Sequence, residues 1–317
     1  MSTRVLGLFA GVGGIETGFM QAGFDAVFAN ELDKKASETY RANYKHELLN
    51  DDIENIVSAD LPDFDVLTGG FPCQPFSISG LRQGFNDAKG RGNVFFKIMD
   101  IINVKQPSVI LLENVKHLVT HDEGRTFKVI LEALAGAGYT VHHKVLNAKT
   151  HGNIPQNRER IFIVGFKNEA HAAKFEFPDE IPLTVSLFDV IDFKNKVEDK
   201  FYYTKDKHKF YGVLEDGMKE QGVIYQFRRS YVRANKSGVS PTLTANMGTG
   251  GNNVPMVLTD HGIRKLTPRE CFNLMGFPAD FIMPNGMAAS NLYKQSGNAV
   301  VVPVIKRIAE NIKAAVS

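Results

Sequence analysis

The sequence predicts an α/β fold: a doubly wound, mainly parallel sheet with an inserted smaller domain of short strands and loops. Apolar runs alternate with helix-periodic stretches over the first 184 residues, and this alternation stops near Val185. A chain of 317 residues is long enough for a complete α/β core and a second domain. We therefore expect a main domain at 1–184, an insertion at 185–262, a connecting segment at 263–289 and a C-terminal part at 290–317 that returns to the main domain.

The first elements have the outline of a Rossmann-like βαβ unit. Residues 4–9 predict a strand, residues 10–14 (AGVGG) a turn, and residues 15–22 a helix that Gly23 ends. Residues 25–29 predict the second strand, and Glu31 follows it about twenty residues after the glycines. Such a unit is typical of nucleotide-type ligands.

The residues around this turn argue against phosphate-bearing ligands. A P-loop requires Gly-Lys-Ser/Thr, whereas Gly14 is followed by Ile15 and Glu16. Glu16 also stands where a dinucleotide fingerprint has its third glycine, and its charge would repel a pyrophosphate. S-adenosylmethionine fits better, because it combines an adenosine with positive charges. Glu31 is then a candidate ligand for the ribose hydroxyls.

A third strand is expected to end at residues 48–49, just before two acidic residues. Asp52 at this place is able to accept a hydrogen bond from an adenine amino group, with Ile53 against the ring. An equally good interpretation is that the acid caps a helix.

Residues 69–77 (GGFPCQPFS) follow a short apolar strand and place Cys73 on a loop between two prolines. The prolines restrict the loop and disfavour a helix through it. In an open α/β sheet the crevice beyond the strand ends is where ligands bind. Cys73 is either a small buried side chain, as a lone cysteine often is, or a nucleophile. This loop alone does not decide between the two.

Further along the main domain, residues 108–112 predict a buried strand that ends at Glu113. A carboxylate there is costly unless it is paired or neutral, so its pKa is expected to rise.

Arg158 and Arg160 precede a strand at 161–166 and, being two apart, would share one face of an extended chain. They are suited to a carboxylate or a phosphate, or they are ordinary surface arginines.

The insertion is basic and aromatic. Residues 194–240 contain eleven Lys or Arg against six Asp or Glu, together with eight Phe or Tyr, although the whole chain has a formal charge of only +2. This combination suits binding of a polyanion, and a solvated surface explains it equally well.

After the insertion, residues 264–274 predict a helix that Thr267 caps, and Gly297 with Asn298 is expected to open a closing helix at about 302–315.

Bulk composition suggests a soluble protein of the cytoplasm. The chain has 43% hydrophobic and 23% charged residues, its N-terminus does not resemble a signal peptide, and two cysteines do not make a disulfide framework.

Taken together, the motifs resemble the DNA (cytosine-5)-methyltransferase family, in the compact form of bacterial restriction-modification systems. They occur in the family's order over nearly the whole chain. They are FAGVGG at 9–14, FPCQ at 71–74, ENV at 113–115, QNRER at 156–160, 264–278 and GNAV at 297–300.

The resemblance implies a catalytic domain at 1–184 and a target recognition domain at 185–262. It implies that Cys73 attacks carbon 6 of a flipped cytosine, that Glu113 binds the ring, and that Arg160 binds the carbonyl oxygen of the base. Arg158 would support the acid, although the two arginines could exchange roles. No metal ion is expected.

The remaining implied site residues bind the cofactor or DNA. For S-adenosylmethionine they are Phe9, Gly11, Gly13, Gly14, Glu31, Asp52, Ile53 and Asn298, and for duplex DNA they are Gln74, Ser77, Arg228, Arg229, Arg233 and Thr242. The DNA would occupy the space between the domains. We expect a monomer, and a cognate restriction endonuclease acting on the same site without stable binding.

Three other functions have to be weighed. A tRNA cytosine-5 methyltransferase would use the same motifs, but the extensive glycine-rich insertion favours duplex DNA. A nicotinamide-dependent oxidoreductase would use the first βαβ unit, and Glu16 argues against it. A DNA-binding protein without chemistry would not be expected to keep Cys73, Glu113 and Arg160 together.

Overall fold

The computed structural model describes residues 3–72 and 93–317. The chain forms two compact units, each assembled from separate segments. Unit 1 consists of Met1–Leu146, Glu159–Asp179 and Val304–Ser317, and unit 2 consists of Asn147–Arg158 and Glu180–Pro303. The insertion expected from residue 185 therefore lies within unit 2, which begins five residues earlier and also contains Asn147–Arg158.

Unit 1 is built on a seven-stranded sheet with the order β3-β2-β1-β4-β5-β8-β6. Neighbouring strands from β3 to β5 run parallel, while β8 runs antiparallel to β5, so the mainly parallel sheet is confirmed. The strands are β1 (Arg4–Leu8), β2 (Asp25–Asn30), β3 (Glu47–Leu49), β4 (Val66–Gly70), β5 (Val109–Val115), β6 (Thr140–Asn147) and β8 (Glu159–Phe166).

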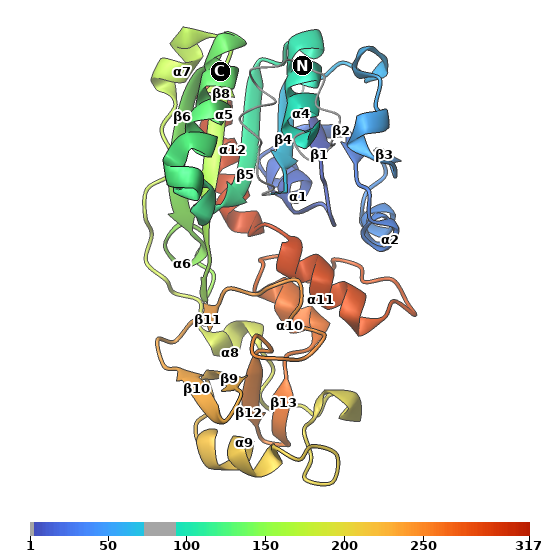
Figure 1. Ribbon diagram of the computed structural model, residues 1–317, viewed down its shortest axis with the longest axis vertical. Coiled ribbons are helices and arrows are strands. Elements are labelled where there is room, and N and C mark those ends of the chain that lie inside the picture. The colour runs from blue at the N-terminus through green and yellow to red at the C-terminus, as the bar shows by residue number, and fades with distance from the viewer. Residues whose placement is uncertain (1–2, 73–92) are drawn as a thin grey trace. The chain divides into compact units, whose positions relative to one another are not determined.

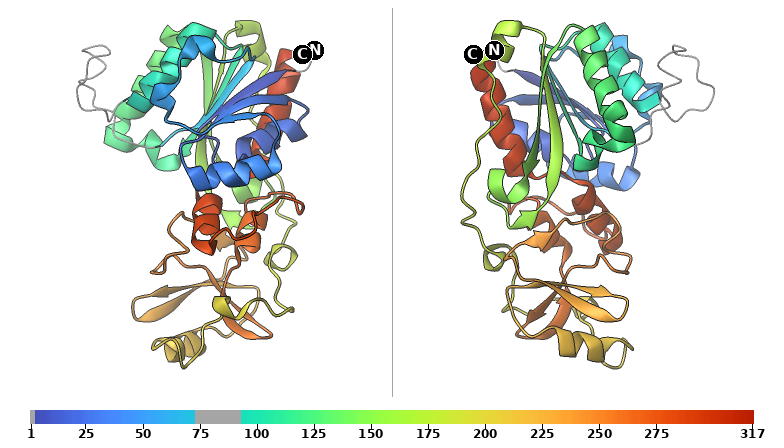
Figure 2. Two further views of the ribbon diagram at one scale, coloured as in Figure 1. Left: turned by 90° about the vertical axis from the view of Figure 1, so that its right-hand side faces the viewer. Right: turned by 60° about the vertical axis from the view of Figure 1, so that its left-hand side comes forward.

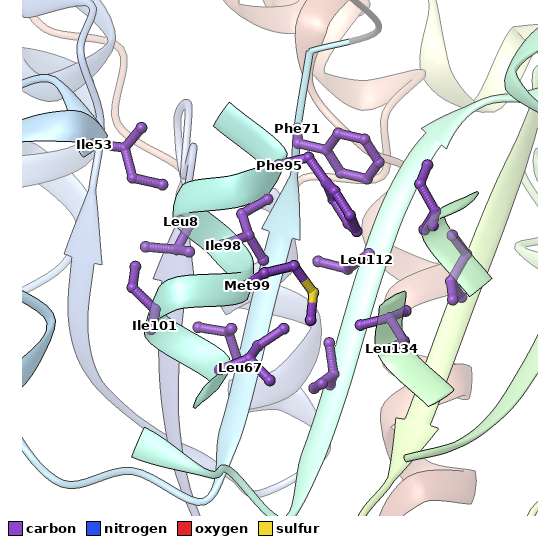
Figure 3. Packing of buried hydrophobic residues seen from close by; sticks show 14 of the residues in the cluster. Leu8, Ile53, Leu67, Phe71, Phe95, Ile98, Met99, Ile101, Leu112 and Leu134 are labelled. Atoms are coloured by element: carbon purple, nitrogen blue, oxygen red, sulfur yellow. The ribbon is translucent and has the colours of Figure 1, made fainter. Parts of the chain in front are cut away.

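Helices cover both faces of this sheet, as the doubly wound pattern requires (Figure 2). Phe95 and Ile98 of α4 pack with Leu8, Leu67 and Leu112 of the sheet, and this cluster forms the core on one face (Figure 3). On the other face α1 packs against α12. The helices are α1 (Gly14–Gln21), α2 (Lys34–Asn43), α4 (Asn93–Lys105), α5 (Arg125–Gly136), α7 (Glu169–Lys174) and α12 (Val302–Val316).

Unit 2 contains a four-stranded antiparallel sheet in the order β10-β9-β12-β13 (Figure 1). Its strands are β9 (Ile224–Arg228), β10 (Tyr231–Asn235), β12 (Met256–Thr259) and β13 (Gly262–Lys265). A second, two-stranded sheet pairs β7 (Gln156–Asn157) with β11 (Ser240–Pro241) in parallel. The helices are α6 (Ala148–His151), α8 (Leu187–Val190), α9 (Tyr211–Gly217), α10 (Pro268–Asn273) and α11 (Ala289–Asn298).

Two expectations about the late elements need correction. The helix expected over 264–274 begins only at Pro268, because Arg264 and Lys265 belong to strand β13. Thr267 caps this helix as expected, in a capping box with Glu270. Gly297 and Asn298 end helix α11 rather than opening the closing helix, which begins at Val302.

Within residues 3–72 and 93–317, no helix combines the length and the apolar character that crossing a bilayer would need.

Candidate active site

The glycine turn after β1 has a backbone that few residues other than glycine adopt. Gly11 and Gly13 have φ angles of 58° and 87°, and Phe9, which is not a glycine, has a φ of 55°. Gly13 is the N-cap of α1, and a Cβ there would overlap the ring of Tyr44. The Tyr44 hydroxyl lies 2.9 Å from the Gly13 carbonyl oxygen and donates to it. Tyr44 therefore fixes the turn, and Gly14 begins the helix behind it.

Glu31 joins this turn to the end of the neighbouring strand. Its Oε2 accepts from the Gly11 amide at 2.8 Å, and its Oε1 accepts from the Asp33 amide at 2.7 Å. Burial raises the pKa of Glu31, and the two amides oppose that rise. Each carboxylate oxygen can accept a further hydrogen bond. The side chain is half-buried, so hydroxyl groups of a ligand are able to reach it.

Asp52 and Ile53 follow β3, the next strand of the sheet. The Asp52 carboxylate accepts from the Glu54 amide at 3.0 Å, so it caps a short 3₁₀ turn (Ile53–Asn55). Helix capping, one of the two interpretations of this acid, is therefore observed. Its second oxygen can still accept from a ligand. Ile53 is buried in the main core.

Cys73, Gln74 and Ser77 lie outside the described residues, but the chain leading to them is described. Strand β4 ends at Gly70, and the buried Asn114 of β5 donates from Nδ2 to the carbonyl oxygen of Phe71 at 2.9 Å. Asn114 thereby holds the backbone two residues before Cys73. This role was not predicted from the sequence, although a second polar residue beside Glu113 at the end of an apolar run was a usable signal.

Glu113 lies beside Gly70 in the register of β4 and β5, and its Oε1 is 3.0 Å from Nε of Arg160. Arg160 is on the antiparallel strand β8, diagonally across from Glu113, because Val115 is its direct partner in the register. Both side chains are largely buried, with 11% and 17% of their surfaces exposed. A guanidinium therefore compensates the strand-end acid.

Arg158 has different partners from those expected. It is buried in unit 2, where it donates to the carbonyl oxygens of Leu243, Gly297 and Ala299 at 2.8, 3.0 and 2.8 Å. The structure thus pairs Arg160, rather than Arg158, with the acid. The expectation that the two arginines share one face of an extended strand is wrong, because they belong to different compact units.

Gln156, two residues before Arg158, also binds backbone groups of unit 2. Its Nε2 donates to Leu274 O at 2.7 Å, and its Oε1 accepts from Leu243 N at 3.0 Å. Thr242, beside this contact, donates to Asn157 O at 2.7 Å. Asn298, at the end of α11, is exposed in this unit. The QNR segment therefore ties together three parts of unit 2.

The hairpin of β9 and β10 has one apolar and one basic face. Phe227 and Val232 belong to a core cluster of unit 2. On the other face Arg228 stands opposite Tyr231, and Arg233 stands opposite Gln226. Arg228 donates to Gln226 Oε1 at 2.8 Å, whereas Arg233, Tyr231 and Arg229 at the turn are exposed. This face is suited to a polyanion that offers acceptors and rings for stacking.

The structure therefore collects several candidate residues at one edge of unit 1, where the parallel strands β1 to β5 end. These are Phe9, Gly11, Gly13, Gly14, Glu31, Asp52, Ile53 and Glu113, with Arg160 beside them. Arg158, Asn298, Thr242 and the three hairpin arginines belong to unit 2. Cys271 is buried in α10, and burial raises its pKa well above the usual value, so it is no candidate nucleophile.

Known proteins share this organisation over almost the whole chain. The sequence model of the C-5 cytosine-specific DNA methylases matches residues 3–314. The chain is 59% identical over 310 residues to Type II methyltransferase M.Bsp6I of Bacillus sp. (strain RFL6), covering 98% of each protein. It is 42% identical to Type II methyltransferase M.NlaX of Neisseria lactamica, covering 99% and 97%.

In fold it is similar to the S. pombe Dnmt2 methyltransferase, with a TM-score of 0.75 at 19% identity over 99% of each chain. The chain belongs to the C-5 cytosine-specific DNA methylase family and is a methyltransferase. The family resemblance seen in the motifs is thereby confirmed, and a nicotinamide-dependent oxidoreductase is excluded.

Proposed function

We propose that this enzyme transfers a methyl group from S-adenosylmethionine to carbon 5 of a cytosine within a short, specific sequence of duplex DNA. The observation that carries the proposal is the buried pair of Glu113 and Arg160 beside the strand that leads to Cys73. An acid held next to a nucleophile loop is what activation of a weakly reactive ring needs.

The glycine turn and the strand ends beside it fit the proposed cofactor. Glu31 has acceptor capacity for ribose hydroxyls, and Asp52 has it for the adenine amino group, with Ile53 beneath the ring. Glycines at 11, 13 and 14 let the backbone come close to the methionine part. We assign Phe9 to the same site, and Asn298 to the end of the cofactor that carries its carboxylate. When bound, the cofactor supplies an electrophilic methyl group.

Cytosine is a poor nucleophile at carbon 5, so we assign the first step to Cys73. Its thiolate adds to carbon 6, while Glu113 donates to N3 of the ring and accepts from the amino group, which draws electrons toward N3. Arg160 holds Glu113 through Nε and has further N–H groups for the carbonyl oxygen of the base. Carbon 5 then takes the methyl group, a base removes the carbon 5 proton, and elimination releases the Cys73 thiolate.

A stacked and paired cytosine does not expose both ring faces, so the base has to be flipped out of the duplex. We assign sequence-independent affinity and target recognition to unit 2. The basic face of the β9–β10 hairpin supports this, with Arg228, Arg229 and Arg233 as candidate base or phosphate ligands. We place Thr242 at the DNA backbone, and Gln74 and Ser77 beside the flipped base.

The relatives M.Bsp6I and M.NlaX are named Type II methyltransferases, which supports a role as the modification enzyme of a restriction-modification system. In such a system a cognate endonuclease cleaves the same sequence when it is unmethylated. We propose that the methyltransferase acts as a cytoplasmic monomer, since each strand of the duplex can be methylated in a separate encounter.

Bisulfite sequencing of DNA from cells that express the protein tests this function. We expect unconverted cytosines at one fixed position of one short sequence, and complete conversion when Cys73 is replaced by serine. Complete conversion with the wild-type protein, or unconverted cytosines without a common sequence, would contradict the proposal.

A further inference from the structure

The proposed mechanism does not use Glu16, the third residue of α1. Its side chain is almost fully buried, with 1% of the residue exposed. Apart from the amide of Glu16 itself, neither carboxylate oxygen has a hydrogen-bond partner among the described residues, and no described cation acts on it. The side chain occupies space that Gly7 of β1 leaves open, since a Cβ at Gly7 would overlap Oε1. Glu16 is thus buried between the first turn of α1 and strand β1.

The groups around Glu16 do not neutralise it. From the end of β2, the Glu31 charge acts on it unfavourably. From α2 and its C-cap, Tyr40 and Tyr44 face it, and the buried Tyr40 hydroxyl lies 2.6 Å from Nε2 of His46. On the α12 side of α1, Lys306 pairs with Glu310 at 3.6 Å. Burial raises the pKa of Glu16 to about 8, with its own amide opposing the rise and Glu31 adding to it.

A buried carboxyl without a partner remains neutral unless a cation approaches it. In a βαβ site, the group on the 5′ carbon of the ribose lies over the glycine turn and the first turn of the helix, where dinucleotides place their pyrophosphate. In the proposed cofactor this carbon carries the sulfonium. When the cofactor is bound, this charge would lie next to the first turn of α1, and in a weakly polar interior it would act strongly on Glu16.

We propose that the protonation state of Glu16 depends on the charge of the bound cofactor. Glu16 releases its proton when S-adenosylmethionine binds. It keeps the proton when the product S-adenosylhomocysteine, which has no sulfonium charge, is bound. This inference rests on the proposed function, because it requires the cofactor at this turn. Glu16 is then a specificity-determining residue that favours substrate over product.

The sign of the pH dependence follows from linkage. The cationic cofactor binds better to the ionised form, so its affinity rises with pH until the free protein is itself ionised, at about pH 8. The affinity for S-adenosylhomocysteine, a neutral thioether, does not increase when Glu16 ionises. If the cation lowers the pKa of Glu16 by roughly 2, the ratio of the two dissociation constants changes more than about tenfold between about pH 6.5 and 8.5 in favour of S-adenosylmethionine.

Isothermal titration calorimetry of the full chain with each compound tests this coupling. Titrations at pH 7 in buffers of different ionisation enthalpy count the released protons. We expect release of most of one proton with S-adenosylmethionine and none with S-adenosylhomocysteine. We also expect Glu16→Gln to lose both the release and the pH-dependent ratio, while His46→Gln, which removes the imidazole beside Tyr40, keeps them.

The outcomes separate the inference from the function it rests on. Binding of both compounds with equal proton release and a constant ratio would overturn the role of Glu16 and leave the proposed cofactor in place. Binding of neither compound at any pH would overturn both. The wild-type titrations decide the question even if Glu16→Gln fails to fold.

Discussion

Glu113 depends on residues from three neighbouring strands. Gly70 of β4 is its partner in the register, Arg160 of β8 pairs with it at 3.0 Å, and Asn114 of its own strand holds the Phe71 carbonyl. These contacts orient the acid together with the start of the loop that carries the proposed nucleophile, Cys73. The positions of such groups matter because catalysis is sensitive to shifts of about 1 Å.

Replacing Glu113 with glutamine keeps the shape of the side chain but removes its ability to give a proton to the ring. We expect methyl transfer to fall by about 10²- to 10⁴-fold, the range typical of a general acid, with DNA affinity nearly unchanged. Tritium transfer from labelled cofactor and DNA binding under the same conditions measure the two effects. Glu159→Gln is the matched control, since Glu159 pairs with Lys116 at the surface. Full activity of Glu113→Gln would refute the acid role.

The sequence was sufficient to single out Glu113, because a carboxylate at the end of an apolar strand needs a reason. It was not sufficient to separate Arg158 from Arg160. Spacing of two residues puts side chains on one face only while the chain stays in one strand. Here β7 ends at Asn157 and β8 begins at Glu159, and the two arginines find partners in different units.

At the scale of elements, unit 2 is organised by a buried ion pair between β13 and α10. Both nitrogens of the Arg264 guanidinium tip bind the Glu270 carboxylate, at 2.6 and 2.8 Å, and neither side chain is more than 5% exposed. Glu270 also accepts from the amides of Asp192 and Thr267. One carboxylate thus connects a strand, a helix start and a distant loop.

Glu270→Gln leaves the buried guanidinium without its counter-charge. We expect the unfolding transition that includes unit 2 to lose about 3–5 kcal/mol, the usual cost of breaking a buried pair from one side. Urea unfolding followed by circular dichroism measures it. Glu38→Gln, which breaks the exposed pair with Lys35, should cause no measurable loss. Equal small losses in both variants would show that the buried pair does not organise unit 2.

Local signals predicted the βαβ elements of unit 1 and the cap at Thr267, because glycine turns and caps are determined by nearby residues. They did not predict the start of the helix expected over 264–274, because tertiary contacts determine it. Arg264 extends as part of β13 because it pairs there with Val257 of β12, a contact that no local pattern reports. The antiparallel course of β8 in the sheet was equally invisible, since strand direction depends on the path of the whole chain.

At the scale of the whole molecule, both units are discontinuous in sequence. Unit 1 is completed by Val304–Ser317, and unit 2 takes in Asn147–Arg158 from between two strands of the main sheet. The proposed reaction needs both units, since the candidate acid lies in unit 1 and the basic hairpin in unit 2. A test of the central claim should therefore require target recognition, base flipping and covalent chemistry in one measurement.

Trapping by 5-fluorocytosine meets this requirement. Fluorine at carbon 5 cannot leave as a proton does, so the enzyme that has attacked carbon 6 and transferred the methyl group remains bound to the base. With duplex DNA that carries 5-fluorocytosine at the target, we predict a denaturation-resistant complex of protein and DNA that requires S-adenosylmethionine and is absent for Cys73→Ser. A wild-type protein that methylates the unmodified sequence but forms no such complex would contradict covalent attack by Cys73.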